Sequence, residues 1–307
     1  MNSCIEILES RIAPAVILVT TSADGTGKGT LRYAITQADL AKTPDSIKFS
    51  TTLSGDTITL ATPLPTLTQS MTITGLGANK LAISGSAAPG SANFEIFNIQ
   101  GGAKGINVTV SGLTLEHGTD FVAGGAMQIN DHGGKVAITN AVIKSNYAGG
   151  FTSAKGGAIA LDNGLLTLSG STISGNTAKG SNGGSAYGGG LYIAATASAV
   201  ISKSTISGNF AIGSAGSDGM GGGNGADGTS SSRKGGDGVD GTAGTDGGTG
   251  AGGGIYCKGV VTLTSTTISG NTTQGGNGGN GGSGGNGGAG ADADSGHPNG
   301  AAAGDHA

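Results

Sequence analysis

Along most of the chain, apolar and polar residues alternate over short stretches that are rich in Thr, Val and Ile and bounded by Gly or Asn. Leu166-Thr167-Leu168 and Val261-Thr262-Leu263 are two examples. A period of two over so few residues is typical of half-buried β-strands and not of helices. The pattern therefore predicts an all-β chain made of many short strands.

The strands recur as one repeated unit. Two apolar residues five positions apart appear as Val110 and Leu115, Ile138 and Ile143, Leu168 and Ile173, Ile201 and Ile206, and Leu263 and Ile268. From Leu115 onward, the second residue of each pair recurs after 28, 30, 33 and 62 residues. Fixed strands with connections of variable length are typical of solenoids, because each repeat contacts only its neighbours. We expect each repeat to form one turn of a parallel β-helix, with equivalent positions stacked about 4.8 Å apart.

Two further motifs keep the same spacing. Glycine pairs or triplets precede four of the strands, as Gly124-Gly125-Ala126-Met127, Gly156-Gly157-Ala158-Ile159, Gly188-Gly189-Gly190-Leu191 and Gly252-Gly253-Gly254-Ile255. Four asparagines each follow the stacked apolar residue by three positions: Asn146, Asn176, Asn209 and Asn271. Glycine permits positive φ and close backbone approach, and stacked asparagines can share amide hydrogen bonds. We interpret these asparagines as a structural ladder, and not as catalytic residues.

The glycine-glycine-alanine-aliphatic motif, alternating with an apolar-x-x-Asn tetrad, resembles the repeats of chlamydial polymorphic outer-membrane proteins and of other bacterial β-helix surface proteins. The resemblance covers about residues 105 to 274, with Ile where that family usually has Phe. It implies a right-handed β-helix with an adhesive or surface role. The departure at Phe weakens any transfer of receptor binding.

The N-terminal residues suggest export and a cap. Leu8 to Pro14 is similar to the Leu-Glu-Pro-Arg-type leader of exported planctomycete proteins, with Ser10 in place of proline, and we take residues 1–15 as an export-related segment. In residues 16–100 we expect a short helical cap followed by irregular repeats, one of them with a strand at Phe94–Phe97. The stretch from Thr30 to Ile35 resembles the Ser-Leu-Arg-x-Ala-Ile module that begins many bacterial β-helix proteins. We expect Thr30 to cap the helix and Arg32 to pair with a carbonyl or carboxylate.

Residues 101–274 then hold the regular repeats, with a glycine-rich insertion at 213–253 and a glycine-rich tail at 275–307. Glycine occupies every third position from 213 to 228, from 235 to 253 and from 275 to 290. This period suits extended helices of three residues per turn whose glycine edges pack together. We expect an antiparallel hairpin of 213–228 and 235–253, turning at Ser230 to Arg233, with the third run beside it; disordered loops are the alternative.

An enzyme is the main alternative function, because parallel β-helices also carry polysaccharide lyases and epimerases. Such enzymes need clustered carboxylates that hold calcium, or paired acids. The candidates are Glu116, His117, Asp120, Asp131, His132, Lys144 and Asp162. We expect an ion pair between Glu116 and Lys144, and a turn at Asp131-His132. No acid recurs from repeat to repeat, so we predict no catalytic residues and no intrinsic catalysis.

The composition of the chain limits the classes of partner and cofactor that it is expected to bind. Of 307 residues, 66 are glycine and only 11% are charged, and the net charge of −4 comes without a basic run, which argues against nucleic acid. Two cysteines give neither a disulfide framework nor a zinc site. No apolar stretch predicts a transmembrane helix. Calcium is the one cofactor left open, since Gly222–Asp227 and Gly235–Asp240 match the start of a calcium-binding nonapeptide.

These observations predict an exported or cell-surface β-helix protein, at the cell surface, the outer membrane or outside the cell. It serves in adhesion or as an extended structural module, and its partners are surface glycans or proteins of neighbouring or host cells. A fragment of a larger surface passenger protein is the third alternative.

Overall fold

The computed structural model describes residues 14–41, 43–85, 94–229 and 234–290. The chain divides into two compact units, which are described separately. Unit 1 comprises Met1–Ala215 and Gly247–Gly276, and unit 2 comprises Gly216–Asp246 and Asn277–Ala307. Unit 2 combines most of the expected glycine-rich insertion with most of the expected tail. Both ends of the insertion, 213–215 and 247–253, belong instead to unit 1.

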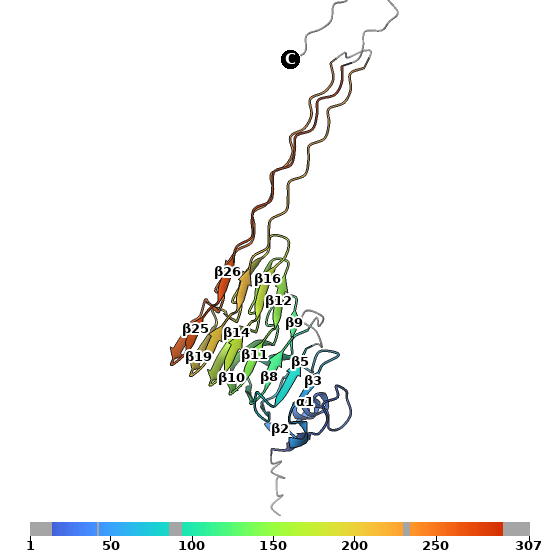
Figure 1. Ribbon diagram of the computed structural model, residues 1–307. Helices are drawn as coiled ribbons and strands as arrows, with labels where there is room; N and C mark the ends of the chain where they lie inside the picture. Colours follow the sequence, from blue (N-terminus) through green and yellow to red (C-terminus); the bar gives the residue numbers. More distant parts are fainter. Residues whose placement is uncertain (1–13, 42, 86–93, 230–233, 291–307) are drawn as a thin grey trace, which may run out of the picture. The chain divides into compact units, whose positions relative to one another are not determined.

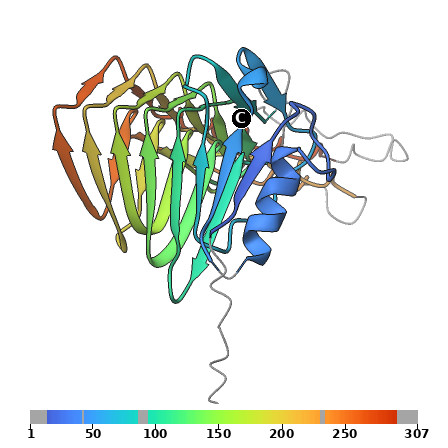
Figure 2. The same ribbon diagram turned by 90° about the horizontal axis from the view of Figure 1, so that it is seen from below.

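In its described residues, unit 1 consists mostly of parallel β-sheets with one α-helix (Figures 1 and 2). The largest sheet, hereafter the large sheet, has eleven strands: β1 (Val16–Val19), β2 (Asp45–Phe49), β4 (Met71–Thr74), β6 (Phe97–Gly102), β7 (Asn107–Ser111), β10 (Met127–Thr139), β14 (Ile159–Ser169), β18 (Leu191–Ile193), β19 (Ala197–Ser202), β23 (Ile255–Cys257) and β24 (Val260–Thr264). The seven-stranded sheet contains β3 (Asp56–Thr59), β5 (Leu81–Ser84), β8 (Thr114–Glu116), β11 (Val142–Lys144), β15 (Thr172–Ser174), β20 (Thr205–Ser207) and β25 (Thr267–Ser269). The five-stranded sheet contains β9 (Thr119–Asp120), β12 (Tyr147–Gly150), β16 (Thr177–Gly180), β21 (Phe210–Ile212) and β26 (Thr272–Gln274), and the three-stranded sheet contains β13 (Ser153–Lys155), β17 (Ser185–Tyr187) and β22 (Gly250–Ala251).

The strands pair with the equivalent strands of neighbouring repeats. In the seven-stranded sheet, Leu115 lies opposite Ile143, then Ile173, Ile206 and Ile268 follow in one column. In the large sheet, Ile138, Leu168, Ile201 and Leu263 form a second column. Equivalent positions therefore stack as the spacing predicts. The residues of both columns are fully buried in the core, except for Leu263 and Ile268 in the last repeat.

The glycine motifs let the chain turn between sheets. The first glycine of each motif has positive φ, from 61° at Gly156 to 71° at Gly188. The second lies against the backbone of the next repeat, since a Cβ at Gly157 would stand 2.2 Å from the carbonyl oxygen of Gly189. Both positions exclude larger side chains, the first by torsion and the second by contact.

The N-terminal cap is a single helix, α1 (Leu31–Leu40), followed by a short 3₁₀ turn at Thr51–Leu53. The Thr30 hydroxyl caps α1 by accepting from the N–H of Tyr33 at 3.2 Å. Its buried residues are Leu31, Ala34, Ile35 and Ala38, the apolar face seen in the sequence. The helix packs against β1 and β2 at one end of the sheet (Figure 2).

The strand expected at Phe94–Phe97 is misplaced. The strand in this region is β6, which begins at Phe97 and extends to Gly102. Ile96 and Phe97 are both fully buried, so the alternation of the preceding residues does not continue into the strand. Both of their N–H groups point at one acceptor, the carbonyl of Ala126.

Unit 2 contains three extended runs, residues 216–229, 234–246 and 277–290, which lie side by side (Figure 1). Every third N–H in each run donates to another run at 2.7–2.9 Å. For example, Gly222 donates to Ser283, Gly282 to Thr242, and Thr242 to Met220. The first two runs are antiparallel, because the residue numbers of the second run rise while those of its partners in the first run fall. The third run is parallel to the first, because the numbers of the paired residues rise together. The expected turn at Ser230 to Arg233 lies outside the described residues.

The glycines at the centre of unit 2 leave no room for a side chain. A Cβ at Gly222 would lie 1.6 Å from the carbonyl oxygen of Val239, and one at Gly241 would lie 2.3 Å from that of Gly282. The expected phase of the third run is wrong by one residue. Its central glycines include Gly279, whose Cβ would be 2.0 Å from an oxygen, whereas Gly278 has nothing nearer than 3.8 Å. In the third run, two of every three residues are glycine, so the sequence alone did not show which of the two series of glycines lies at the centre.

Candidate functional site

The candidate acids of the sequence lie in separate structural contacts. Lys144 Nζ is 3.1 Å from Glu116 Oε2, and the two residues are paired positions of β11 and β8. The ion pair is the one expected from the sequence. It lies partly in solvent, since the Lys144 side chain is 46% exposed.

His117 and Asp120 shape the backbone next to that pair. His117 has a positive φ of 57°, and its Nδ1 lies 3.3 Å from the Ser84 hydroxyl. Asp120 Oδ1 accepts from the N–H groups of Val122 and Ala123, both at 2.7 Å. This carboxylate therefore closes a turn in the manner common for aspartate.

Asp131 and His132 do not form the expected turn. They belong to β10, at a register shift where four residues, 131–134, stand opposite the single Gly164 of β14. Asp131 is fully buried, and its Oδ1 accepts from the Ile106 N–H at 2.9 Å, whereas His132 is exposed. Among the described residues, Oδ2 of Asp131 has no hydrogen-bond partner.

The surroundings of Asp131 disfavour its charge. Burial raises the pKa of this carboxyl group, against the opposing effects of the Ile106 hydrogen bond and the nearby His132. Glycines make room for the group: a Cβ at Gly101 would be 1.6 Å from Oδ1, and one at Gly134 would be 1.9 Å from Oδ2. The carboxyl group thus ties β10 to the segment before β7 from inside the structure.

A row of amide side chains crosses the outer face of the large sheet beside His132. Asn163 Nδ2 donates to Asn130 Oδ1 at 2.8 Å, and Asn130 Nδ2 donates to Gln100 Oε1 at 3.2 Å. Gln100 Nε2 continues the row to Asn98 Oδ1 at 2.9 Å. A shallow depression of about 530 Å³ adjoins the row and is lined by His132, Gly133, Gly134, Lys135, Asn163, Gly164, Leu165 and Thr196.

Asp162 lies at the edge of this face. Its Oδ2 is 3.4 Å from Gln128 Nε2, a long and weak contact, and its backbone carbonyl accepts from Thr196 Oγ1 at 2.9 Å. The amide row was not predicted from the sequence. Its signal was there, because Asn98, Gln100, Gln128 and Asn130 all occupy the outward positions of alternating strands.

The four ladder asparagines form a continuous chain of amide hydrogen bonds. Asn146 donates to Asn176, Asn176 to Asn209, and Asn209 to Asn271, each from Nδ2 to Oδ1 at 2.9 Å. Each Oδ1 also accepts the backbone N–H of the preceding asparagine at 3.0 Å. At the N-terminal end the N–H of Gly118, the residue at the equivalent position, donates to Asn146 at 2.9 Å.

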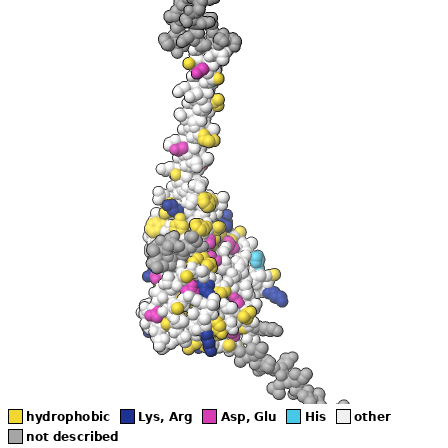
Figure 3. Space-filling view, turned by 90° about the vertical axis from the view of Figure 1, so that its right-hand side faces the viewer, with side chains coloured by type: hydrophobic (Ala, Val, Ile, Leu, Met, Phe, Trp, Pro, Cys, Tyr) yellow, Lys and Arg dark blue, Asp and Glu magenta, His cyan; other side chains and the backbone are white. Residues whose placement is uncertain are grey.

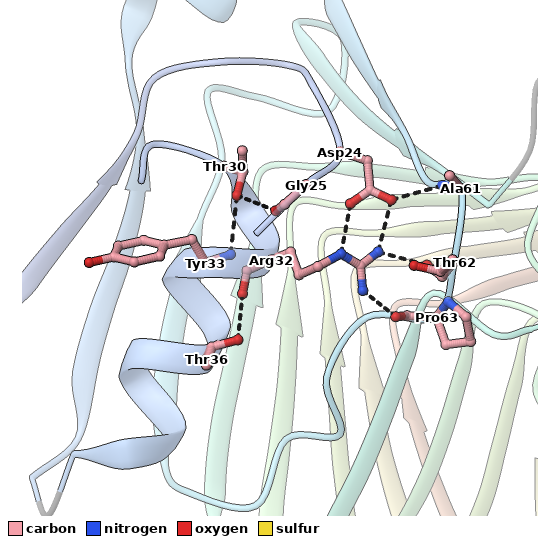
Figure 4. Close-up of polar contacts among 9 residues, drawn as sticks. All are labelled: Asp24, Gly25, Thr30, Arg32, Tyr33, Thr36, Ala61, Thr62 and Pro63. Carbon is pink, nitrogen blue, oxygen red and sulfur yellow. Dashed lines mark hydrogen bonds and ion pairs between the residues drawn. The ribbon is translucent and has the colours of Figure 1, made fainter. Parts of the chain in front are cut away.

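Arg32 is held in the N-terminal cap (Figure 4). Its Nε and Nη2 donate to the two carboxylate oxygens of Asp24 at 3.0 and 2.8 Å, and the guanidinium also donates to the carbonyls of Thr62 and Pro63. Burial raises the pKa of Asp24, but the hydrogen bonds from Arg32 and from the Ala61 N–H outweigh it and leave the pKa below its usual value. The arginine therefore joins α1 to the loop after β3, which is the pairing expected from the sequence.

Within the described ranges, His, Cys, Asp and Glu form no group of three or more that is arranged to hold a metal ion. The two glycine-rich matches to the calcium nonapeptide, Gly222–Asp227 and Gly235–Asp240, fall in the paired runs of unit 2. No helix among the described residues could span a membrane.

Comparison with known proteins gave no match to a family model, to a curated protein or to a solved structure.

Proposed function

We propose that this chain is an exported or cell-surface protein, whose unit 1 is a right-handed parallel β-helix that serves in attachment or as an extended structural module, without intrinsic catalysis. The observation that carries the proposal is the asparagine ladder, which keeps one register over Asn146, Asn176, Asn209 and Asn271. Such a ladder fits a long, rigid body built by repetition.

The pairing of the strands supports the β-helix. Consecutive strands such as β14, β15 and β16 belong to three different sheets, and each pairs in parallel with its equivalent in the next repeat. A chain that visits three sheets in turn and returns one strand further along is the connectivity of a β-helix. Its right hand is the one that the resemblance to bacterial surface proteins implies.

The contacts of the candidate acids support a non-catalytic role. Glu116 pairs with a lysine, Asp120 closes a turn, and Asp131 is buried with a backbone partner. A general acid or calcium-binding carboxylate needs access to substrate or ion, and these three have structural partners instead. Export and surface location rest on the leader-like residues and on the family resemblance.

The proposal is tested with the purified full chain and with the cells that produce it. We expect no unsaturated products from pectin or alginate, with or without calcium, and we expect binding to a panel of surface glycans and to intact cells. Protease added to intact producing cells should remove the protein. Turnover that disappears in Asp131→Ala or Asp162→Ala would overturn the non-catalytic function, and full protection from external protease would overturn the location.

A further inference from the structure

Three tyrosines of this chain lie in contact with one another. The chain has five tyrosines and no tryptophan, and three of the five lie on neighbouring strands: Tyr187 in β17, Tyr192 in β18 and Tyr256 in β23. Tyr192 and Tyr256 are register partners. We refer to the three residues as the tyrosine cluster.

Tyr187 belongs to the three-stranded sheet and contacts Tyr256 from there, whereas Tyr192 and Tyr256 lie on the outer face of the large sheet. On that face one column runs from Asn98 through Gln128 and Ala160 to Tyr192 and Tyr256. The flanking residues on these strands, such as Leu191 and Ile193, belong to the core, so alternation places the column on the opposite face.

The rings support one another and carry cations. The rings of Tyr192 and Tyr256 stack with centroids 5.9 Å apart and planes 9° apart, and Tyr187 lies 4.8 Å from Tyr256 at a tilt of 42°. Lys155 Nζ is 5.4 Å from the Tyr192 centroid, and Lys258 Nζ is 6.0 Å from that of Tyr256. These separations are within the range of aromatic and cation–π attraction.

The three rings differ in exposure. Tyr192 is only 5% exposed and acts as the base of the cluster, while Tyr187 and Tyr256 are partly exposed. Burial raises the pKa of Tyr192, and the nearby Asp162 adds to the effect, so this hydroxyl stays protonated. Two partly exposed rings on a rigid base present apolar faces whose positions are fixed before any ligand arrives.

The chemistry of this face suits a sugar chain. Aromatic faces pack against the C–H faces of pyranose rings, and an amide side chain such as that of Gln128, whose one contact among the described residues is long, can donate to and accept from hydroxyl groups. Equivalent positions on neighbouring strands recur about every 4.8 Å, close to the length of one pyranose unit in an extended polymer. The ammonium groups of Lys155 and Lys258 add a preference for carboxylates.

We propose that the tyrosine cluster, with Lys155 and Lys258, is a binding site for an anionic polysaccharide of the uronic acid class. The site rests on the proposed attachment function and gives it a location and a ligand. The sugar chain lies along the column, with one unit against Tyr187 and Tyr256 and its carboxylates near the two ammonium groups.

The test is calorimetric titration of the full chain with an oligogalacturonate, with its carboxyl-reduced neutral counterpart and with poly-glutamate. We expect the oligogalacturonate to bind most tightly, the neutral sugar more weakly and poly-glutamate not measurably. Tyr256→Ala should weaken binding about tenfold, whereas Tyr256→Phe should retain it because the ring remains. Lys258→Gln should weaken binding of the acidic oligomer severalfold and leave binding of the neutral one unchanged. The matched control is Lys48→Gln, at an exposed lysine of β2.

Thermal melts of each variant establish that it is folded. Equal affinity of wild type and Tyr256→Ala overturns the site, and binding of poly-glutamate as tight as that of the sugar overturns the ligand class. If surface glycans bind but the Tyr256 and Lys258 variants bind them equally, the attachment function stands and this site fails. If no glycan binds and acidic polysaccharide is cleaved, the proposed function fails as well.

Discussion

Unit 1 and unit 2 both align equivalent residues in rows, but they do so with opposite means. Rows in unit 1 are made of side chains, such as the column of Ile143, Ile173 and Ile206 and the asparagine ladder. Rows at the centre of unit 2 are made of glycine, where a Cβ at Gly222 or Gly279 would overlap a neighbouring backbone oxygen. In the space-filling view, unit 2 shows mainly backbone and small polar side chains with scattered apolar ones (Figure 3).

The difference shows where each unit obtains its stability. Burying an Ile side chain in unit 1 contributes about 1.5–3 kcal/mol through the hydrophobic effect. Unit 2 buries almost no such surface, and its runs are joined instead by one backbone hydrogen bond every third residue. Glycine loses the most entropy on ordering, so the close approach of three backbones must offset that loss. Unit 1 should therefore tolerate loss of one contact, whereas unit 2 should not tolerate an added atom.

The largest effect is expected for Gly222→Ala. The new Cβ would stand 1.6 Å from the Val239 carbonyl oxygen, and a backbone atom cannot move aside as a flexible side chain can. We expect unit 2 to be destabilised by at least about 3 kcal/mol, the upper end of ordinary overpacking. Amide hydrogen exchange should accelerate in residues 216–229, 234–246 and 277–290 while unit 1 keeps its protection. Unchanged exchange in these runs would mean that glycine is not required at the centre.

The next effect concerns the ladder. Asn176→Ala removes an amide that donates to Asn209 and leaves buried groups without partners, so we expect a loss of about 1–3 kcal/mol. The smaller loss should be that of Asn271→Ala, because in the described residues no further asparagine accepts from Asn271 and its side chain is less buried. Thermal melts compare the two. A melt of Asn176→Ala that matches wild type would contradict the ladder.

Asp131 extends the comparison of the two units. In unit 2 the glycines make room for neighbouring backbones, whereas in unit 1 Gly101 and Gly134 make room for the Asp131 side chain. Burial raises the pKa of Asp131 in the folded protein above its ordinary value, so ionisation opposes folding. The loss of stability caused by ionisation of Asp131 is absent below the pKa of the unfolded state. It grows as the pH rises from that pKa to the raised pKa of the folded state, and it stays constant at higher pH. Asp131→Asn should keep the Ile106 hydrogen bond and cannot ionise, so we expect it to be more stable than the wild type at neutral pH by on the order of 1 kcal/mol.

The measurement is a series of thermal melts from acid to neutral pH. The wild type should lose stability relative to Asp131→Asn across this range, and the two should converge in acid. Asp120→Asn is the matched control, since that carboxylate accepts two N–H groups in a turn. A constant difference between wild type and Asp131→Asn at all pH values would contradict the burial effect.

The smallest effect is expected for Gly223→Ala, one residue after the disruptive site. Its Cβ would meet nothing within 4 Å, and its φ is not in the left-handed region. Alanine reduces the freedom of the unfolded chain, so we expect a gain of about 0.4–1 kcal/mol. The gain is measured by denaturant unfolding, with amide hydrogen exchange in unit 2 as the signal. A loss similar to that of Gly222→Ala would show that the three phases of the run are equivalent.

Local patterns predicted the strands and their register well, because alternation and the five-residue spacing act within one repeat. Leu115, Ile143 and Ile173 could be aligned from sequence, and so could the first glycine-rich run. The start of β6 was missed because Ile96 and Phe97 are both buried, which depends on the carbonyl of Ala126 in another repeat. The turn expected at Asp131 failed for a similar reason, since the N–H of Ile106 holds that residue in a strand.

The tyrosine cluster was also missed, although a signal exists. Tyr192 and Tyr256 both stand two residues after the last glycine of a Gly-Gly-Gly triplet. They are 64 residues apart, and only the recognition that the glycine-rich insertion separates adjacent repeats brings them together. Their contacts with Lys155 and Lys258 depend on side-chain positions that no local pattern specifies.

The three-residue period of unit 2 limits how its length can change during evolution. Gly222 pairs with Ser283, Gly282 with Thr242, and Thr242 with Met220, so each run fixes the register of the other two. Loss of one residue from any run would bring a side chain to the centre at most of the later triplets. Growth or shortening without that penalty requires whole triplets, added to all three runs together. The length of unit 2 can therefore change only in steps of three residues per run. Related chains should differ in the length of these runs by multiples of three residues.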